Sequence, residues 1–169
     1  LFGWYGSYQA MMEITLDGTL LSSDVENIPV LIKLDENFSY DKAQADGSDL
    51  RFMDQNNALY SYEIEQWDPN GTSLIWVLVP LIRAGQDTTI LLYWGDGLAR
   101  SLSSGADTFG TGYLGVWHLA EDSGQFKDST GNDNHGTPEG GATTGSGKIG
   151  TALVLDGIDD RVNFGSDSS

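Results

Sequence analysis

The sequence contains no cysteine, and only 8 lysine and arginine residues stand against 25 aspartate and glutamate residues, a formal net charge of −17. The absence of cysteine excludes disulfides, thiolate zinc sites and cysteine nucleophiles. The excess of carboxylates opposes binding to phosphate-rich partners, so we expect no nucleic-acid partner. No run of about eighteen apolar residues is present, so we expect no direct membrane insertion.

Glycine and small polar residues are abundant instead. There are 22 glycines among 169 residues, a composition that favours a turn-rich β protein and is common among secreted modules. We therefore expect an extracellular, cell-surface or periplasmic location. Because the chain begins with Leu1, without a basic and apolar leader, we expect a processed or excised segment.

Short apolar runs separated by turn residues predict antiparallel strands. Asp17-Gly18 and the run 68–71 are strong turn signals, whereas residues 37–46 predict a turn or a single helical turn. Pro29 lies near the start of its run, where a missing backbone donor is tolerated. Strands are expected at residues 11–16, 28–34, 50–53, 59–67, 74–79 and 89–94.

Period-two alternation divides the run 59–67 into two faces. Tyr62 and Ile64 fall on an apolar face, and Glu63, Glu65 and Trp67 fall on the other. Paired carboxylates are the catalytic groups of glycosidases, but alternation already explains this spacing, and we favour a solvated acidic face. We expect this run to form a hairpin with the run 50–53.

The segment 98–112, rich in Ser, Gly, Ala and Thr, indicates a domain boundary. New β patterns follow at residues 113–119, 152–155 and 161–164. We expect a first domain over residues 1–104, a linker over 105–112 and a second segment over 113–169. The predicted fold class is all-β: an antiparallel, jelly-roll-like β-sandwich followed by a partial second β-sandwich segment.

Two parts of the chain resemble known families. The first resembles the bacterial and archaeal family DUF2341, through Ile28-Pro-Val-Leu-Ile-Lys-Leu34, Asp46-Gly-Ser-Asp-Leu-Arg-Phe52, Tyr62-Glu-Ile-Glu-Gln-Trp67, Ile75-Trp-Val-Leu-Val-Pro80 and Ile90-Leu-Leu-Tyr-Trp-Gly95. Residues 113–166 resemble the opening of a concanavalin-like, laminin-G-type jelly roll, through Gly115-Val-Trp-His-Leu119, Asp128-Ser-Thr-Gly-Asn132, Gly136-Thr137 and Leu155-Asp-Gly-Ile-Asp-Asp-Arg-Val162.

These resemblances imply a β-sandwich in an extracellular or periplasmic setting, in large exported proteins that bind glycans or adhere. DUF2341 is also fused to proteins resembling the TolQ and ExbB proton channels. A jelly roll has about eight strands, and residues 113–169 supply three or four, so we expect the second domain to be incomplete. Either the chain is a fragment, or a neighbouring chain supplies strands in a homo-oligomer or filament.

Aromatic and acidic residues near turns are candidates for glycan binding, because aromatic rings stack on sugars and carboxylates accept hydroxyl hydrogen bonds. We expect Trp76 and Trp94 to lie in the core. The candidate ligand-binding residues are Trp67, Asp46, Asp49, Trp4 and Tyr5.

Asp156, Asp159 and Asp160 form a candidate calcium site, since Ca²⁺ prefers oxygen ligands, and Asp46, Asp49 and Asp54 offer a second oxygen cluster. Aspartates also cap turns, and turn chemistry is the favoured interpretation at both places. We expect no cofactor, with Ca²⁺ as the one alternative.

The sequence offers no nucleophile elbow or base partner, so we expect no enzyme. Core or sheet-surface roles are favoured for His118 and His135. Two hypotheses remain. One is a carbohydrate-recognising or adhesive module whose partner is a glycan. The other is a structural module, a filament subunit or external domain of a membrane machine, that pairs through open β-edges with a neighbouring protein chain.

Overall fold

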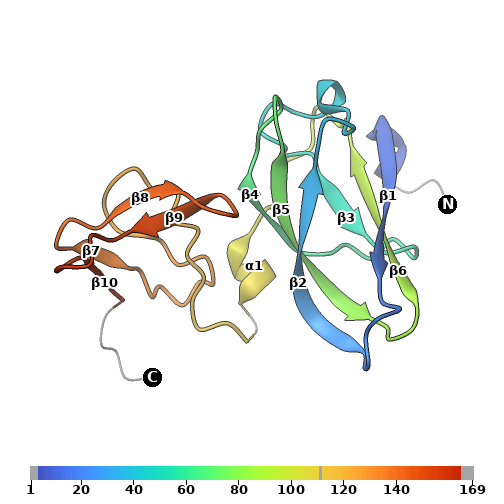
Figure 1. Cartoon of the computed structure of the whole chain (residues 1–169). Coiled ribbons are helices and arrows are strands. Elements are labelled where there is room, and N and C mark those ends of the chain that lie inside the picture. Colours follow the sequence, from blue (N-terminus) through green and yellow to red (C-terminus); the bar gives the residue numbers. More distant parts are fainter. Residues whose placement is uncertain (1–3, 111, 165–169) are drawn as a thin grey trace. The chain divides into compact units, whose positions relative to one another are not determined.

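The computed structural model describes residues 4–110 and 112–164, in two compact units, Leu1–Ser104 and Gly105–Ser169 (Figure 1). The first unit contains two three-stranded antiparallel sheets. Two 3-10 turns, η1 (Trp4–Ser7) and η2 (Tyr40–Lys42), lie outside the sheets. No described helix is long and apolar enough to cross a membrane.

One sheet has the order β1 (Ala10–Asp17), β6 (Asp87–Trp94), β3 (Arg51–Met53). β1 is the strand expected at 11–16: Met12, Ile14 and Leu16 are partly buried and pack on the core, and the residues between them are exposed. The pairing of β1 with β6 is regular from Ala10 opposite Trp94 to Asp17 opposite Asp87.

The other sheet has the order β2 (Val25–Leu34), β5 (Ser73–Ile82), β4 (Tyr62–Gln66). β2 pairs only with β5 and is therefore an edge strand. Proline has no backbone N–H, and an edge strand tolerates Pro29 because one of its sides has no neighbouring strand. The turn at 68–71 joins β4 to β5 as predicted, with the Gly71 N–H donating to Asp68 O at 3.2 Å.

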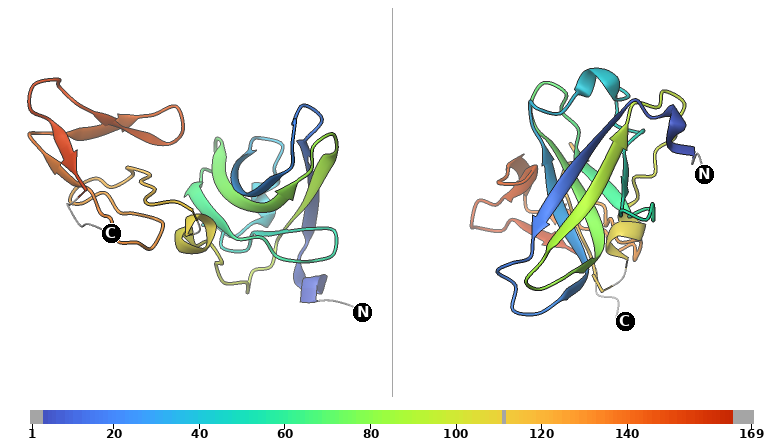
Figure 2. Two further views of the ribbon diagram at one scale, coloured as in Figure 1. Left: turned by 90° about the horizontal axis from the view of Figure 1, so that it is seen from below. Right: turned by 90° about the vertical axis from the view of Figure 1, so that its right-hand side faces the viewer.

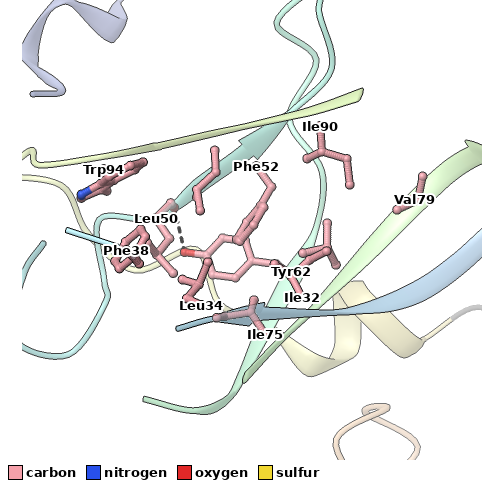
Figure 3. Packing of buried hydrophobic residues seen from close by; sticks show 12 residues of the cluster. Ile32, Leu34, Phe38, Leu50, Phe52, Tyr62, Ile75, Val79, Ile90 and Trp94 are labelled. Carbon is pink, nitrogen blue, oxygen red and sulfur yellow. Dashed lines mark hydrogen bonds between the residues drawn. The ribbon is translucent and has the colours of Figure 1, made fainter. Parts of the chain in front are cut away.

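The two sheets enclose one hydrophobic core, to which all five strands β2 to β6 contribute buried side chains (Figures 2 and 3). Tyr62 is 1% exposed, and its hydroxyl donates to Leu50 O at 3.0 Å. Trp94 is buried here, as predicted. The prediction of an all-β, antiparallel sandwich is confirmed.

Two local predictions in this unit are wrong, and one is only partly correct. The runs 50–53 and 59–67 begin as a short antiparallel hairpin, with a bridge between Met53 and Leu59 and the Tyr60 N–H donating to Phe52 O at 2.8 Å, but β3 and β4 then belong to different sheets. Trp76 lies outside the core, half-buried, with its Nε1 donating to Glu65 Oε2 at 2.9 Å. Trp67 is not a solvent-facing residue, because a register shift in β4 turns it inward to the core.

That shift is a β-bulge. Ile64 lies opposite Ile75 and Gln66 lies opposite Leu74, so Glu65 is an extra residue in β4. One inserted residue exchanges the two faces of every position that follows. Trp67 therefore joins the face of Tyr62 and Ile64 that covers the core.

The second unit is built from short elements: α1 (Gly105–Phe109) and two antiparallel strand pairs, β7 (Thr137–Glu139) with β10 (Arg161–Asn163) and β8 (Thr143–Ser146) with β9 (Thr151–Val154). The segment predicted as a linker, 105–112, contains α1. The strand predicted at 113–119 is absent from these described residues, whereas the strands predicted at 152–155 and 161–164 match β9 and β10.

Replacing Tyr62 by Phe is expected to lower the free energy of unfolding by about 0.5–1.5 kcal/mol, because the buried hydrogen bond from its hydroxyl to Leu50 O is lost, while Arg51 still donates to that carbonyl. Urea unfolding of the chain measures this. Tyr60→Phe is the control, since Tyr60 packs against the same core and is less buried. Equal losses in the two variants would contradict a specific role for the Tyr62 hydroxyl.

Candidate functional site

One end of the first unit carries an open cleft of about 380 Å³. Its walls are the segment after β2, which runs into η2, and the turn between β4 and β5; Figure 1 shows both at the same end of this unit. We call this opening the end cleft. The lining residues are Glu36, Phe38, Tyr40, Pro69, Asn70, Gly71 and Thr72.

Aspartates shape both walls of the end cleft. Asp35 Oδ1 accepts hydrogen bonds from the backbone N–H of Asn37 at 2.9 Å and from its side-chain amide at 3.0 Å. Asp68 Oδ1 accepts the backbone N–H of Asn70 at 3.0 Å. Such bonds from an aspartate to the backbone two residues on are a recurrent turn geometry. The bonds from Asn37, backbone first and then side chain, hold the pKa of Asp35 below its ordinary value.

Aromatic side chains pack beneath the end cleft. The ring centroid of Phe38 lies 4.8 Å from that of Tyr40, 6.1 Å from that of Trp67 and 4.5 Å from that of Trp94. Tyr40 and Trp67 meet edge to face at 5.2 Å. Aromatic pairs at these separations gain about 0.5–1.5 kcal/mol beyond their buried area. The cleft therefore has a firm apolar floor.

Hydrogen bonds fix the Tyr40 ring at this floor. Its hydroxyl donates to Leu34 O at 2.7 Å and accepts the backbone N–H of Ser73 at 3.1 Å. The Ser73 hydroxyl in turn accepts the Asp68 N–H at 2.9 Å, at the base of the turn. The Tyr40 hydroxyl thus joins the end of β2 to the start of β5, and Tyr40 presents its ring to the cleft.

The end cleft combines this apolar floor with a polar rim. Asn70 and Thr72 are exposed neutral groups, and Glu36 is the one ionisable carboxylate among the lining residues. Apolar rings with a few oriented polar groups form the usual surface for a sugar, whose ring faces are apolar and whose hydroxyls both donate and accept.

Trp67, predicted to be an exposed ligand-binding residue, lies behind this floor and does not line the cleft. Its ring covers Gly47, which has φ +70°, and a Cβ at Gly47 would stand 2.8 Å from Trp67 Cε3. Only glycine suits this left-handed, crowded position. The Trp67 indole N–H is buried and has no hydrogen-bond partner among the described residues.

The predicted site residues Asp46 and Asp49 serve the local backbone. Asp49 is fully buried, and its carboxylate accepts the Gln44 N–H at 2.9 Å and the Gly95 N–H at 2.6 Å. This burial makes Asp49 a structural group and not a surface ligand, which corrects the prediction. Asp46 is exposed and accepts hydrogen bonds from the Ser48 N–H and hydroxyl. These bonds, hydroxyl first, lower the pKa of Asp46.

Arg51 is an important residue that sequence reasoning missed. It is 4% exposed, and its guanidinium donates to the carbonyl oxygens of Ser48, Leu50 and Arg100. An arginine in an alternating strand normally reaches solvent, so the pattern carried no sign of this role. Arg51 ties the loop before β3 to the segment after β6.

The two remaining predicted sites are the aromatic pair near the start of the chain and the aspartate cluster of the second unit. Trp4 and Tyr5 belong to η1, and their side chains lie outside the described part of the structure. Asp156, Asp159 and Asp160 each bring one carboxylate oxygen within 4.8 Å of the others. In this turn Asp160 Oδ2 accepts the Asp156 N–H and Asp156 Oδ1 accepts the Ile158 N–H, both at 2.8 Å. The geometry serves the turn and also places three oxygens of the kind that Ca²⁺ prefers.

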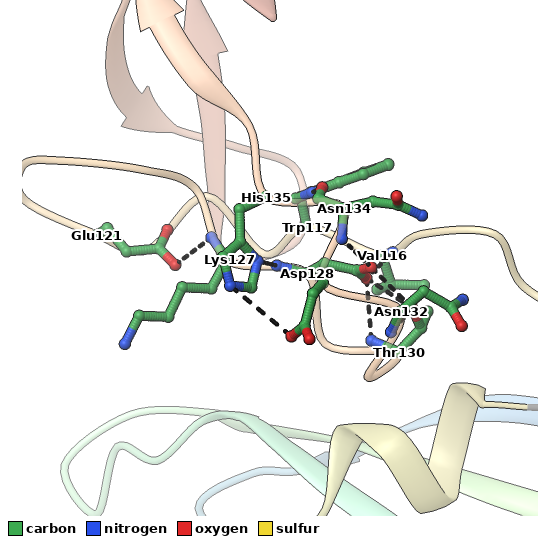
Figure 4. Close-up of polar contacts among 10 residues, drawn as sticks. Val116, Trp117, Glu121, Lys127, Asp128, Thr130, Asn132, Asn134 and His135 are labelled. Carbon is green, nitrogen blue, oxygen red and sulfur yellow. Dashed lines mark hydrogen bonds and ion pairs between the residues drawn. The ribbon is translucent and has the colours of Figure 1, made fainter. Parts of the chain in front are cut away.

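Asp128 organises the loops of the second unit (Figure 4). It is buried, with Oδ1 accepting the N–H groups of Val116 and Thr130 at 3.0 Å each and Oδ2 accepting the Asn134 N–H at 3.1 Å. Burial raises the pKa of Asp128, but the bonds from Thr130, Val116 and Asn134 outweigh burial and leave the pKa below its ordinary value. This carboxylate anchors the segment 113–119, which forms no strand, at the Val116 N–H.

The remaining candidates for catalysis take structural positions. The Asp128 N–H donates to His135 Nδ1 at 3.1 Å, and the His118 ring lies 6.0 Å from that of Phe109. Glu63 and Glu65 are half-buried in β4, so the predicted fully solvated acidic face is only partly correct. Glu65 accepts a hydrogen bond from the Trp76 indole N–H, so Glu63 and Glu65 do not have the same role.

Residues 46–114 match the family model described as Domain of unknown function (DUF2341). Four of the five resembling blocks lie inside this match, and the block at 28–34 lies outside it. The match also extends past the end of the first unit through α1. No curated protein and no solved structure matches the chain, and none supports the laminin-G-like resemblance of residues 113–166.

The lowered pKa of Asp128 predicts a pH dependence. Its carboxylate adds stability that is fully present above its ordinary pKa of about 4 and is lost as the pH falls through its lower folded-state pKa. Asp128→Ala should cost about 1–3 kcal/mol at pH 6, because buried N–H groups lose their acceptor, and this cost should shrink at pH 2. Urea unfolding at the two pH values measures it, with the exposed Asp122→Ala as control; a cost that does not change with pH would contradict the prediction.

Proposed function

We propose that the first unit is a non-catalytic carbohydrate-binding module of an exported protein, and that the end cleft is its binding site. The observation that carries this proposal is the cleft itself: Phe38 and Tyr40 form its floor, and Asn70 and Thr72 stand on its rim. A saccharide ring stacks on the floor, and its hydroxyls exchange hydrogen bonds with the rim.

The chemistry of the end cleft supports binding over turnover. Glycoside hydrolysis commonly requires two carboxyl groups on either side of the scissile bond. Glu36 alone among the described lining residues carries one. The hydroxyl of Tyr40 is bonded to Leu34 and Ser73, which suits a fixed platform better than a reacting group. The turn-rich composition supports an exported setting.

Asn70→Ala is expected to weaken saccharide binding about 3- to 10-fold through the loss of one hydrogen-bonding group. A glycan array identifies the ligand, and titration calorimetry measures its dissociation constant. Asn56→Ala is a matched control, because Asn56 also donates its N–H to an aspartate two residues earlier, Asp54, in a turn at the opposite end of the unit. An array on which the protein binds no glycan would refute the proposal.

A second candidate function is assembly through open sheet edges, favoured by one observation. β1 and β2 are edge strands of opposite sheets, and a groove of about 370 Å³ between them is lined by Met12, Ile14, Leu31 and Ile32 among others. An extended strand from a neighbouring chain would pair with an edge and place its apolar side chains in this groove.

Assembly predicts concentration-dependent oligomers that Met12→Lys disrupts, since an inward charge blocks strand addition at an edge. Met11→Lys is the control, because Met11 is 49% exposed on the other face of β1. Light scattering over a wide concentration range measures both, with thermal unfolding to confirm that the variants fold. A monomer at every concentration would exclude self-assembly.

We also propose that the second unit is part of a laminin-G-type jelly roll. Its support is the sequence resemblance of residues 113–166, together with two short antiparallel strand pairs. Val154 and Leu155, at the end of β9, are 52% and 50% exposed. Additional strands packed on this surface would bury such residues.

A further inference from the structure

The end cleft has a charge pattern that bears on which saccharides it accepts. Glu36 lines the cleft, and two more carboxylates stand in the turns that form its walls, Asp35 beside Glu36 and Asp68 before Pro69. Glu36 and Asp35 are exposed. No lysine or arginine is among the described lining residues.

The turns keep these carboxylates in place. Asp35 and Asp68 each accept a backbone N–H two residues ahead, so their charges are fixed at the walls. The low pKa of Asp35, caused by the bonds from Asn37, keeps it ionised at neutral pH. Lys42 is exposed at the end of η2, but it does not line the cleft.

The whole chain reinforces this local field, because its net charge is −17. A surface of one sign attracts ligands of the opposite sign and repels ligands of its own sign, and both effects weaken as salt screens the charges. Uronic acids, sialic acids and sulfated sugars are anionic and would approach against this field. A sugar with a free amino group is cationic at neutral pH.

Resting on the proposed function of the end cleft, we propose that it selects saccharides by charge and prefers amino sugars with a free ammonium group. Glu36 is the group that meets the ammonium, while the aromatic floor and the neutral rim bind the sugar ring regardless of charge. The preference order is cationic above neutral above anionic.

Three tetrasaccharides of different charge test this order by titration calorimetry at 20 and 150 mM salt: a glucosamine oligomer, its N-acetylated counterpart and an oligogalacturonate. We expect the glucosamine oligomer to bind about 2- to 5-fold more tightly than the neutral one at low salt, the range of an exposed ion pair. This ratio should fall at the higher salt concentration. The oligogalacturonate should bind most weakly.

Glu36→Gln should bring the ratio of cationic to neutral binding close to one, because the ammonium group loses its carboxylate partner. Glu26→Gln is the matched control: it makes the same change in net charge at an exposed glutamate near the start of β2, whereas Glu36 follows the end of that strand. If both variants lower the ratio equally, the attraction belongs to the whole chain and the role of Glu36 is refuted.

The outcomes separate this inference from the proposal on which it rests. Equal binding of all three oligomers, or tighter binding of the oligogalacturonate, would overturn charge selection and leave saccharide binding intact. Failure of all three to bind, together with an array on which no glycan binds, would refute both.

Discussion

Two loops of the first unit that are distant in the sequence are joined inside it by one buried carboxylate. Asp49 accepts the N–H of Gln44 before β3 and the N–H of Gly95 after β6. A buried charge is costly unless hydrogen bonds satisfy it. Once satisfied, it holds both backbones to one geometry, so the loop before β3 and the end of β6 form a single rigid structure.

The aromatic floor depends on this arrangement. Gln44, whose N–H donates to Asp49, lies in the same loop as Gly47. Because Gly47 has no side chain, the Trp67 ring can pack directly against it. Trp67 in turn supports Phe38 and Tyr40 from behind. The DUF2341 match begins at residue 46, within this loop. The polar interior and the aromatic floor of the cleft are therefore parts of one structure, in which buried hydrogen bonds position the rings.

Much of the sheet structure could be predicted, because alternation and turn residues are local signals. The strands at 11–16, 28–34, 74–79 and 89–94 and the turn at 68–71 are confirmed. The errors come from nonlocal effects. Sequence alternation carries no sign of the extra residue in β4 that turns Trp67 inward. Nor does it show that Arg51 finds carbonyl acceptors inside the protein, or that the end cleft forms from two segments more than twenty residues apart.

The order of strands in the first unit also bears on how the chain folds. In its two sheets, β4 and β5 are the only consecutive strands that pair with each other. β2 pairs with β5, which is synthesised three strands later. β1 pairs with β6, the last strand of the unit to be synthesised. Nonlocal pairings of this kind slow folding. During synthesis β1 would remain unpaired until nearly the whole unit had left the ribosome. In the finished fold β1 is an edge strand, so its departure would break the pairing with β6 and with no other strand.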